Sequence, residues 1–286
     1  MAASTAALRG ITKQYKDFTL GPVDMTVPAG SIVGLIGENG AGKTTLLKIL
    51  CGVNRADDGT VDLLGGSPAD AATRAKIGVV FEDAFFYGSF TAAQVARSLA
   101  GMYGARWNAD SFSAYLRRFG LDAGKKLKEY SRGMRLKLSL AAALAHDPEL
   151  LVLDEATAGL DPVVRGELLD LFLEFIQDER HSIVMSSHIT ADLEQIADSI
   201  AYLHNGQLLF QENKDDLLQE YGVLHCGEDV LPSLPAGLVV FTRRGAYGCE
   251  SLVRERRTVQ ELRPDAVCDA ARLDDIMRFY SGRDAQ

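Results

Sequence analysis

The sequence has few cysteines, and their spacing suits neither a metal site nor an obvious crosslink. Four occur among 286 residues, Cys51, Cys226, Cys249 and Cys268, and none belongs to a C-x-x-C pair. This spacing excludes the common zinc patterns. We therefore expect free thiols in a reducing compartment, with a disulfide within the C-terminal part of the chain as the alternative.

Long apolar runs and an excess of positive charge are also missing. No apolar run approaches the roughly 18 residues of a spanning helix, and LSLAAALA is among the longest. The opening segment MAASTAALRG lacks the basic stretch and apolar core of a secretory signal. The formal net charge of −9 disfavours sequence-independent nucleic-acid binding, which needs a basic face. We expect a cytoplasmic chain that binds no nucleic acid and reaches a membrane only through a partner.

The chain instead alternates short apolar runs with helical patterns, which indicates an α/β fold. Its apolar fraction of 47% suits an ordinary globular protein. Apolar runs at 31–37, 149–155 and 182–187 predict buried strands covered on both faces. A helix should follow the first of them, from Lys43 to its end at Gly52.

The remaining segments differ in texture. The first 30 residues are short alternating pieces broken by GP and PAG, which predicts an antiparallel β-subdomain. Residues 88–145 are mainly helical and predict an insert between the core strands. After about residue 221 the segment GEDVLPSLPAG suggests a linker or loop, followed by short strands and a final helix. We expect one large domain over 1–221 and a small α+β appendage of unknown role over 222–286.

The segment GENGAGKT fits the phosphate-loop pattern G-x-x-x-x-G-K-[ST], with a strand before it and a helix after it. Glycines let backbone N–H groups approach phosphate oxygens, and the helix start attracts the same anion. Lys43 would reach the β- and γ-phosphates, and Thr44 would supply a hard oxygen for Mg²⁺. A glycine-rich turn with an incidental lysine is the alternative. The predicted nucleotide-binding residues are Gly37, Glu38, Asn39, Gly40, Ala41, Gly42, Lys43 and Thr44.

An acidic pair ends the second core strand, in LLVLDEATAGLD. Neighbouring strand residues point to opposite sides, so Asp154 can face the metal while Glu155 faces the attacking water as general base. A polar turn at a strand end is the alternative. Asp161, before Pro162, makes a good helix N-cap, a role that can coexist with a functional one. His188 could donate a hydrogen bond to the γ-phosphate, although a lone histidine is more often structural.

Taken together, these residues resemble the ATP-binding subunit of ABC transporters over about residues 8–212. GENGAGKTT looks like Walker A, LLVLDE like Walker B with its catalytic glutamate, AGLD like the D-loop and SSH like the switch histidine. The segment YSRGMRLKLSLAAALAHDPELLVLDEATAGLDP resembles the signature helix followed directly by Walker B, an order and spacing found in this family. The resemblance implies a P-loop ATPase that binds ATP and Mg²⁺ and hydrolyses the ATP.

The resemblance also implies roles for single residues. Tyr15 matches the aromatic that stacks on adenine, with a core aromatic as the alternative, and Thr45 matches the residue that reaches the α-phosphate. Ser131 and Gly133 match the signature positions that cap the γ-phosphate of the opposite subunit. The implied catalytic residues are Lys43, Glu155 and His188. The implied metal ligands are Thr44, Glu82 and Asp154. The further ATP contacts are Tyr15, Thr45, Glu82, Ser131, Gly133, Met134 and Asp161.

Two departures from the family pattern bear on the site. SRGM replaces the usual SGGQ, so Arg132 stands for a glycine and Met134 for a glutamine whose amide contacts it cannot make. Because the serine and second glycine remain, we expect a working cap of altered character. Glu82 stands at the Q-loop glutamine, where a carboxylate can still ligate Mg²⁺ or its water.

The sub-type resemblance is to bacterial multidrug, antibiotic and antimicrobial-peptide exporters, through YSRGM, the Q-loop glutamate and the tail ending LDDIMRFY. It implies a motor that works as a nucleotide-sandwich homodimer or heterodimer and drives membrane-spanning permease subunits on separate chains from the cytoplasmic face of the membrane. The aromatics of AFFYGSF would receive a short permease helix, or would pack the helical insert onto the core. Two rivals remain: a soluble ABC-type ATPase, and a low-turnover nucleotide sensor suggested by SRGM and Glu82.

Overall fold

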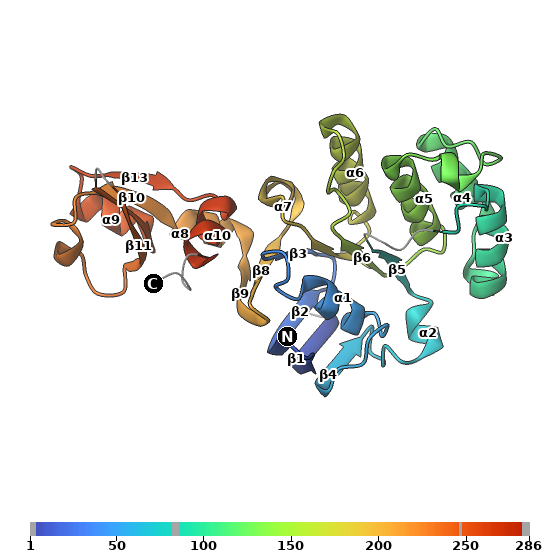
Figure 1. The fold of residues 1–286 in the computed structure, drawn as a ribbon, viewed down its shortest axis with the longest axis horizontal. Helices are drawn as coiled ribbons and strands as arrows, with labels where there is room; N and C mark the ends of the chain where they lie inside the picture. The colour runs from blue at the N-terminus through green and yellow to red at the C-terminus, as the bar shows by residue number, and fades with distance from the viewer. Residues whose placement is uncertain (1–3, 82–85, 246–247, 282–286) are drawn as a thin grey trace.

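The fold is described from a computed structural model over residues 4–81, 86–245 and 248–281. The described chain forms three β-sheets with helices packed around them (Figure 1). The strands are β1 (Ser4–Gln14), β2 (Thr19–Pro28), β3 (Ile32–Ile36), β4 (Asp58–Leu63), β5 (Ile77–Val80), β6 (Leu150–Asp154), β7 (Ser182–Ser186), β8 (Ser199–His204), β9 (Gln207–Asn213), β10 (Gly222–Cys226), β11 (Val239–Gly245), β12 (Gly248–Val253) and β13 (Val267–Ala270). The α-helices are α1 (Lys43–Leu50), α2 (Ala71–Arg74), α3 (Ala92–Tyr103), α4 (Ala109–Arg118), α5 (Arg132–Leu144), α6 (Pro162–Phe175), α7 (Thr190–Ile196), α8 (Lys214–Glu220), α9 (Arg256–Leu262) and α10 (Leu273–Ser281).

The central sheet has the strand order β5-β6-β7-β3-β8-β9, and β9 alone runs antiparallel to its neighbour. Its strands β3, β6 and β7 confirm the three predicted buried runs. In β6, Leu151 and Leu153 pack into one apolar cluster while Leu150 and Val152 pack into another. Because alternate residues of a strand face opposite sides, the two clusters lie on opposite faces of the sheet. Two covered faces explain why these runs show no polar alternation.

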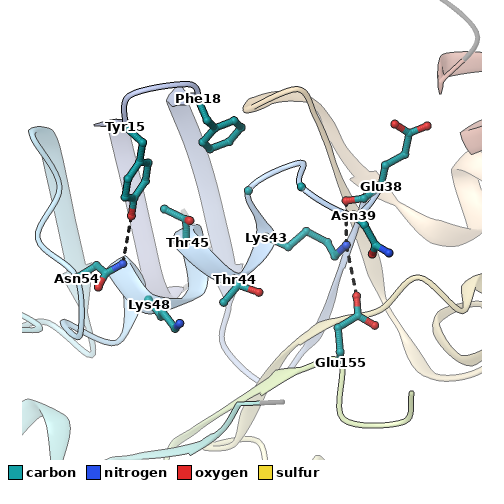
Figure 2. A pocket seen from close by; sticks show the side chains of 12 residues that line it. Tyr15, Phe18, Glu38, Asn39, Lys43, Thr44, Thr45, Lys48, Asn54 and Glu155 are labelled. Atoms are coloured by element: carbon teal, nitrogen blue, oxygen red, sulfur yellow. Dashed lines mark hydrogen bonds and ion pairs between the residues drawn. The ribbon is translucent and has the colours of Figure 1, made fainter. Parts of the chain in front are cut away.

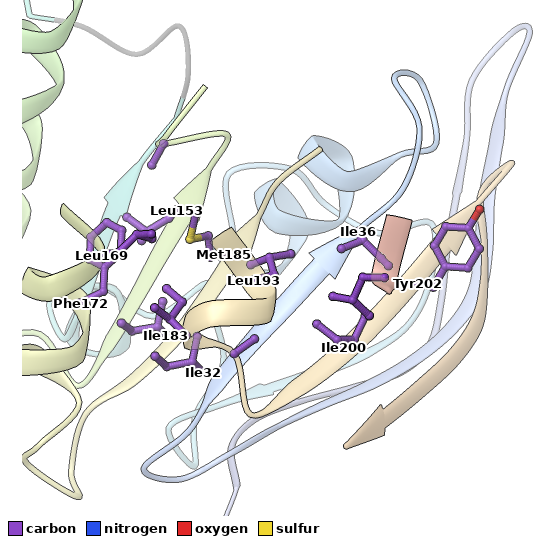
Figure 3. Packing of buried hydrophobic residues seen from close by; sticks show 14 of the residues in the cluster. Ile32, Ile36, Leu153, Leu169, Phe172, Ile183, Met185, Leu193, Ile200 and Tyr202 are labelled. Carbon is purple, nitrogen blue, oxygen red and sulfur yellow. The ribbon is translucent and has the colours of Figure 1, made fainter. Parts of the chain in front are cut away.

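Different layers cover the two faces. On one side, Leu169 and Phe172 of α6 and Leu193 of α7 pack against Ile183 and Met185 of the sheet (Figure 3). On the other side lie α1 and the antiparallel sheet β2-β1-β4, which joins the second cluster. This arrangement confirms the α/β class with an antiparallel β-subdomain. It also places the start of α1 at the carboxyl ends of β3 and β6, where ligands of parallel sheets bind.

The predicted break at the GP dipeptide is wrong, because Gly21 and Pro22 lie inside β2. Strand β2 stays paired with β1 along its length, and an irregular register near Val23 accommodates the dipeptide. Gly21 has a φ of 99°, and a Cβ there would lie 2.0 Å from the Ile11 carbonyl oxygen. Glycine therefore allows two antiparallel strands to approach where another residue would end the pairing.

Helices α3, α4 and α5 form the predicted helical insert and have an apolar cluster of their own. Val95 of α3, Phe112 and Leu116 of α4, and Leu138 of α5 are buried in it. Capping residues fix where each helix begins: Thr91 forms a capping box for α3, and the side chain of Asn108 caps α4. The insert follows β5 and returns to the central sheet at β6.

The C-terminal appendage is a four-stranded antiparallel sheet of order β11-β12-β10-β13. One face packs on α9, and the opposite face shares the apolar cluster of the central sheet through α10. The ring of Tyr280 in α10 lies 5.6 Å from Tyr202 of β8 and 4.9 Å from Phe241 of β11. The segment GEDVLPSLPAG connects β10 to β11, so it is a loop inside the appendage and the linker interpretation is wrong. The domain boundary at 221/222 stays a prediction.

Candidate functional site

The predicted phosphate loop connects the end of β3 to the start of α1. Close packing requires glycine at both of its ends. A Cβ on Gly37 would lie 2.2 Å from the carbonyl oxygen of Leu203. Gly42 has a φ of 107°, and a Cβ there would lie 2.9 Å from a ring carbon of Phe18. The loop therefore brings bare backbone to the N-terminus of α1, where N–H groups can hold an anion.

The side chain of Lys43 is folded back against the loop and is only 6% exposed. Its Nζ donates hydrogen bonds to the carbonyl oxygens of Gly37 at 2.7 Å and Glu38 at 3.3 Å. The same ammonium forms an ion pair with Glu155, at 3.3 Å from Oε1 (Figure 2). The carboxylate that directly follows β6 thus neutralises the lysine that begins α1, about 110 positions earlier in the sequence.

Asp154 ends β6 with a side chain that is 2% exposed and fully hydrogen-bonded. Its Oδ2 accepts a hydrogen bond from Thr44 Oγ1 at 2.8 Å, and its Oδ1 accepts one from Ser186 Oγ at 2.6 Å. A hydroxyl and a carboxylate in contact beside a phosphate loop are the oxygen ligands that Mg²⁺ prefers when phosphates and water complete its shell. The donor set therefore fits Mg²⁺. Within the described residues, no cluster of three or more His, Cys, Asp or Glu side chains suits a metal held by protein alone.

Glu155 follows Asp154 and faces different partners. Its backbone is left-handed, with a φ of 52°, and its side chain is 11% exposed. Oε2 lies 2.6 Å from Nδ1 of His188, whose backbone N–H also donates to it at 3.3 Å. Because an ionised carboxylate only accepts, Nδ1 of His188 carries the proton in this contact. The geometry joins a carboxylate, an imidazole and the ammonium of Lys43 in one group.

Lys43, Thr44 and Glu155 line an open cavity of about 490 Å³ (Figure 2), whereas Asp154 and His188 do not line it and join the group through their hydrogen bonds to Thr44 and Glu155. Tyr15 forms its far end and is 43% exposed, which disfavours the core-aromatic alternative. The complete lining is Tyr15, Phe18, Glu38, Asn39, Gly40, Gly42, Lys43, Thr44, Thr45, Lys48, Asn54 and Glu155. The cavity thus runs from the aromatic side chain of Tyr15 to the phosphate loop and Glu155.

Sequence reasoning missed three lining residues: Phe18, Lys48 and Asn54. Asn54 Nδ2 donates to the Tyr15 hydroxyl at 3.4 Å. Lys48 lies one helical turn after Thr45, so helical spacing could have placed it on the cavity face. Phe18 and Asn54 gave no such signal, because they reach the cavity only through the pairing of β1 with β2 and the turn after α1.

The signature residues form a second group that does not line this cavity. Ser131 caps α5, and its Oγ accepts the N–H of Met134 at 3.2 Å. Gly133 lies close to Leu160, and Arg132 lies close to Gly159 of the segment AGLD. Within a single copy of the chain, the signature residues therefore take no part in the cavity that the phosphate loop lines.

Other predicted residues have structural surroundings. Asp161 caps α6 by accepting the N–H groups of Val163 and Val164 at 3.2 and 3.1 Å. Met134 is half-buried against the apolar cluster of the helical insert. Glu82 lies outside the described residues. Its role stays a prediction.

The aromatic segment AFFYGSF is described from Phe86 onward, and Phe85 lies outside the described residues. Phe86 and Phe90 are half-buried against the cluster of the insert, as the packing alternative predicts. Tyr87 differs, because it is 78% exposed while its ring centroid lies 5.7 Å from that of Phe90. Among the aromatics of this segment that the structure describes, Tyr87 is therefore the one available at the surface.

The cysteines are free thiols in this structure. Burial raises the pKa of Cys51 to about 12 and that of Cys226 to about 12, which makes both thiols poor nucleophiles at neutral pH. Cys226 faces Cys249 across β10 and β12, with 3.7 Å between the sulfur atoms. Over the described residues, no helix is long and apolar enough to cross a membrane.

Comparison with known proteins gives consistent matches. The family model "ABC transporter" matches residues 20–158. The Synechocystis protein sll0415, an uncharacterised ABC transporter ATP-binding protein, is 38% identical over 70% of this chain and 58% of its own length. The bacitracin transport ATP-binding protein BcrA of Enterococcus faecalis is 36% identical over 72% of this chain and 68% of its own.

A solved structure, described as an ATP-binding subunit of an ABC transporter, superposes with a TM-score of 0.69 at 29% identity. The superposition covers 75% of this chain and 92% of that one. The chain belongs to the ATP-binding proteins of ABC transporters and is a P-loop ATPase.

Proposed function

We propose that this ATPase is the motor subunit of a membrane exporter and works as a dimer that closes on ATP and drives membrane-spanning subunits on separate chains. The observation that carries the proposal is one connected group of side chains: Lys43, Thr44 and Glu155 line the cavity, Asp154 is hydrogen-bonded to Thr44, and His188 is hydrogen-bonded to Glu155. Such a grouping combines anion binding, metal ligation and activation of water in a single place.

In the proposed complex ATP lies along the cavity. Tyr15 stacks on the adenine, Thr45 contacts the α-phosphate and Lys43 holds the β- and γ-phosphates, together with loop residues Gly37, Glu38, Asn39, Gly40, Ala41 and Gly42. The open side of the cavity leaves the terminal phosphate accessible to a second subunit. Binding should depend on the ammonium group, so Lys43→Ala should abolish binding of a fluorescent ATP analogue. Unchanged binding by that variant would contradict the assignment of the cavity.

Thr44 and Asp154 would hold Mg²⁺, with Glu82 as a further ligand or a contact to its water. When bound, Mg²⁺ neutralises the negative charge of the phosphate groups. Within the chain, Glu155 accepts the proton of the water that attacks the γ-phosphorus, and ADP leaves. His188 orients Glu155 through Nδ1. Its side chain is 51% exposed, which leaves its other nitrogen free to meet the γ-phosphate.

The second half of each site would come from another copy or from a related subunit. Ser131 and Gly133 would cap the γ-phosphate across the dimer. Met134 of the same signature motif and Asp161 of the segment AGLD would make further contacts with the ATP. Their position outside the cavity of their own chain supports this assignment. Light scattering on Glu155→Gln should show dimers with ATP and monomers with ADP. Monomers under both conditions would contradict the sandwich.

A role in transport is supported by the relative whose printed name assigns it to bacitracin transport, and export is the direction that we propose. The proposed location is the cytoplasmic face of the membrane, with Tyr87 at the contact with a permease. The full chain, tagged and solubilised from membranes of its source cell, should co-purify with a membrane-spanning protein. Recovery only on ribosomes or DNA would favour the soluble ATPase instead. Tight ATP binding without turnover would favour the nucleotide sensor.

A further inference from the structure

Ser186 is the last residue of β7 and contacts both members of the acidic pair, with a side chain that is 0% exposed. Its Oγ donates a hydrogen bond to Asp154 Oδ1 at 2.6 Å. The same Oγ accepts the backbone N–H of Glu155 at 3.1 Å. We propose that Ser186 is a positioning residue for the ATPase reaction, which orients Asp154 toward Mg²⁺ and holds Glu155 as the base. This inference rests on the proposed function of the cavity.

The Asp154 carboxylate is held at both of its oxygens. Each of its two carboxylate oxygens accepts one hydroxyl: Oδ2 from Thr44 and Oδ1 from Ser186. Two bonds on different oxygens fix the rotation of the carboxylate about its Cβ–Cγ bond. Thr44 is itself a proposed metal ligand, so among the described residues Ser186 is the hydroxyl donor to this carboxylate that would not itself ligate Mg²⁺. Outer partners of this kind typically change metal affinity by about 10–100-fold.

The backbone of Glu155 also depends on Ser186. Its φ of 52° is in the left-handed region, which residues with a side chain adopt only where their surroundings hold them. The surroundings here are the Ser186 hydroxyl at 3.1 Å and the Ser186 carbonyl oxygen at 3.2 Å, which share the Glu155 N–H. This conformation turns the Glu155 side chain toward Lys43 and His188. Ser186 therefore acts on the base through the main chain.

The strand provides a matched control. Ser182 begins β7, four residues before Ser186, and so points to the same face of the sheet. It is also 0% exposed, and its hydroxyl contacts Thr5 Oγ1 at 2.7 Å, in the β-subdomain. Loss of either hydroxyl leaves buried polar groups without a partner, so both alanine variants should be less stable. Of these two serines, only Ser186 contacts the acidic pair.

The test compares Ser186→Ala, Ser186→Thr and Ser182→Ala in the purified full chain. Turnover is measured against ATP and Mg²⁺ concentration. Binding of Mn²⁺ with a non-hydrolysable ATP analogue is measured by electron paramagnetic resonance, and stability is measured by thermal melting. Ser186→Ala should bind Mn²⁺ about 10–100-fold more weakly and have a correspondingly lower kcat. Its KM for ATP should change by less than about threefold, because the loop contacts remain.

The threonine variant keeps the hydroxyl and should recover most of the Mn²⁺ affinity, while Ser182→Ala should melt earlier with wild-type Mn²⁺ binding. Wild-type Mn²⁺ affinity and kcat in Ser186→Ala, or an equal loss in Ser182→Ala, would overturn the proposal. If Ser186→Ala does not fold, Ser186→Cys gives the same comparison at similar volume. Failure of the wild-type chain to bind ATP would refute the proposed function itself, which separates the two failures.

Discussion

When ATP binds, Lys43 must leave its ion pair with Glu155 and bind phosphate instead. A change to this ion pair should therefore change the affinity for ATP. In the structure the ammonium lies 3.3 Å from Glu155 Oε1 and 2.7 Å from the Gly37 carbonyl oxygen. Glu155→Gln removes the competing charge and also removes repulsion of the γ-phosphate. We expect this variant to bind ATP more tightly than wild type and to lose hydrolysis, since its amide cannot accept the proton of water.

The size of the effect follows from the contact. At 3.3 Å and an effective dielectric constant of about 20, the gross attraction between Lys43 and Glu155 is about 5 kcal/mol. The two side chains are 6% and 11% exposed, so desolvation cancels much of this attraction. A net value of about 1–2 kcal/mol remains, near the range of hydrogen bonds to charged groups. The Kd for ATP should therefore fall by about 5–30-fold.

The assay is equilibrium titration with ATP in Mg²⁺, with phosphate release measured in parallel. Glu149→Gln is the control, because Glu149 lies just before β6 and pairs with Lys76 at 3.2 Å, away from the cavity. The control should keep the wild-type Kd and kcat. Unchanged or weaker ATP binding by Glu155→Gln would show that the ion pair with Glu155 does not compete with ATP for Lys43. Undiminished hydrolysis would remove Glu155 as the base.

Three further predictions concern other parts of the chain. Gly42→Ala should lower the melting temperature by roughly 2–10 °C, because the φ of 107° at this position and the ring of Phe18 both exclude a Cβ. Differential scanning calorimetry measures this temperature, and an unchanged value would contradict the prediction. A hydrogen bond from the Arg180 side chain lowers the pKa of Asp178 to about 2 from 3.8, so its contribution to stability is complete above the higher value and lost as pH falls toward the lower one. An NMR titration of Arg180→Ala should show that pKa raised toward 3.8, with part of the lowering retained because the backbone N–H of residue 180 still donates to Asp178. Oxidised glutathione should convert Cys226 and Cys249 into a disulfide by thiol–disulfide exchange. The reaction should be slow at pH 7 and faster at higher pH, because burial raises the pKa of Cys226 to about 12. Mass spectrometry should detect the crosslink in the wild-type chain and not in Cys226→Ser.

Local patterns were sufficient to predict the central strands and the phosphate loop. The runs at 31–37, 149–155 and 182–187 appear as β3, β6 and β7, since a strand buried on both faces needs only apolar residues in sequence. The loop was predictable because its glycines, lysine and threonine are consecutive. These features depend on neighbours along the chain, and single-sequence reasoning detects such features well.

The errors and omissions arise where distant segments meet. GP inside β2 looked like a strand break, because only the register with β1 shows that the pairing continues past Gly21. GEDVLPSLPAG suggested a linker or a loop, and its composition could not decide for the loop because it does not reveal that β10 and β11 belong to one sheet. Ser186 was read only as part of SSH, although its contact with Asp154 spans 32 residues. No local pattern encodes such contacts.

The separation of the two residue groups explains why ATP can control assembly in the proposed dimer. The start of α1 meets the cavity in its own chain, whereas the start of α5 does not, and Ser131 already caps the Met134 N–H there. A helix start capped by its own serine needs no ligand for stability, so the folded monomer gains nothing from ATP at α5. The γ-phosphate held by Lys43 would therefore gain its second set of donors only from another copy. In the proposed dimer Arg132 would add a positive charge to that set, and this addition would increase the dependence of closure on the charge of the bound nucleotide.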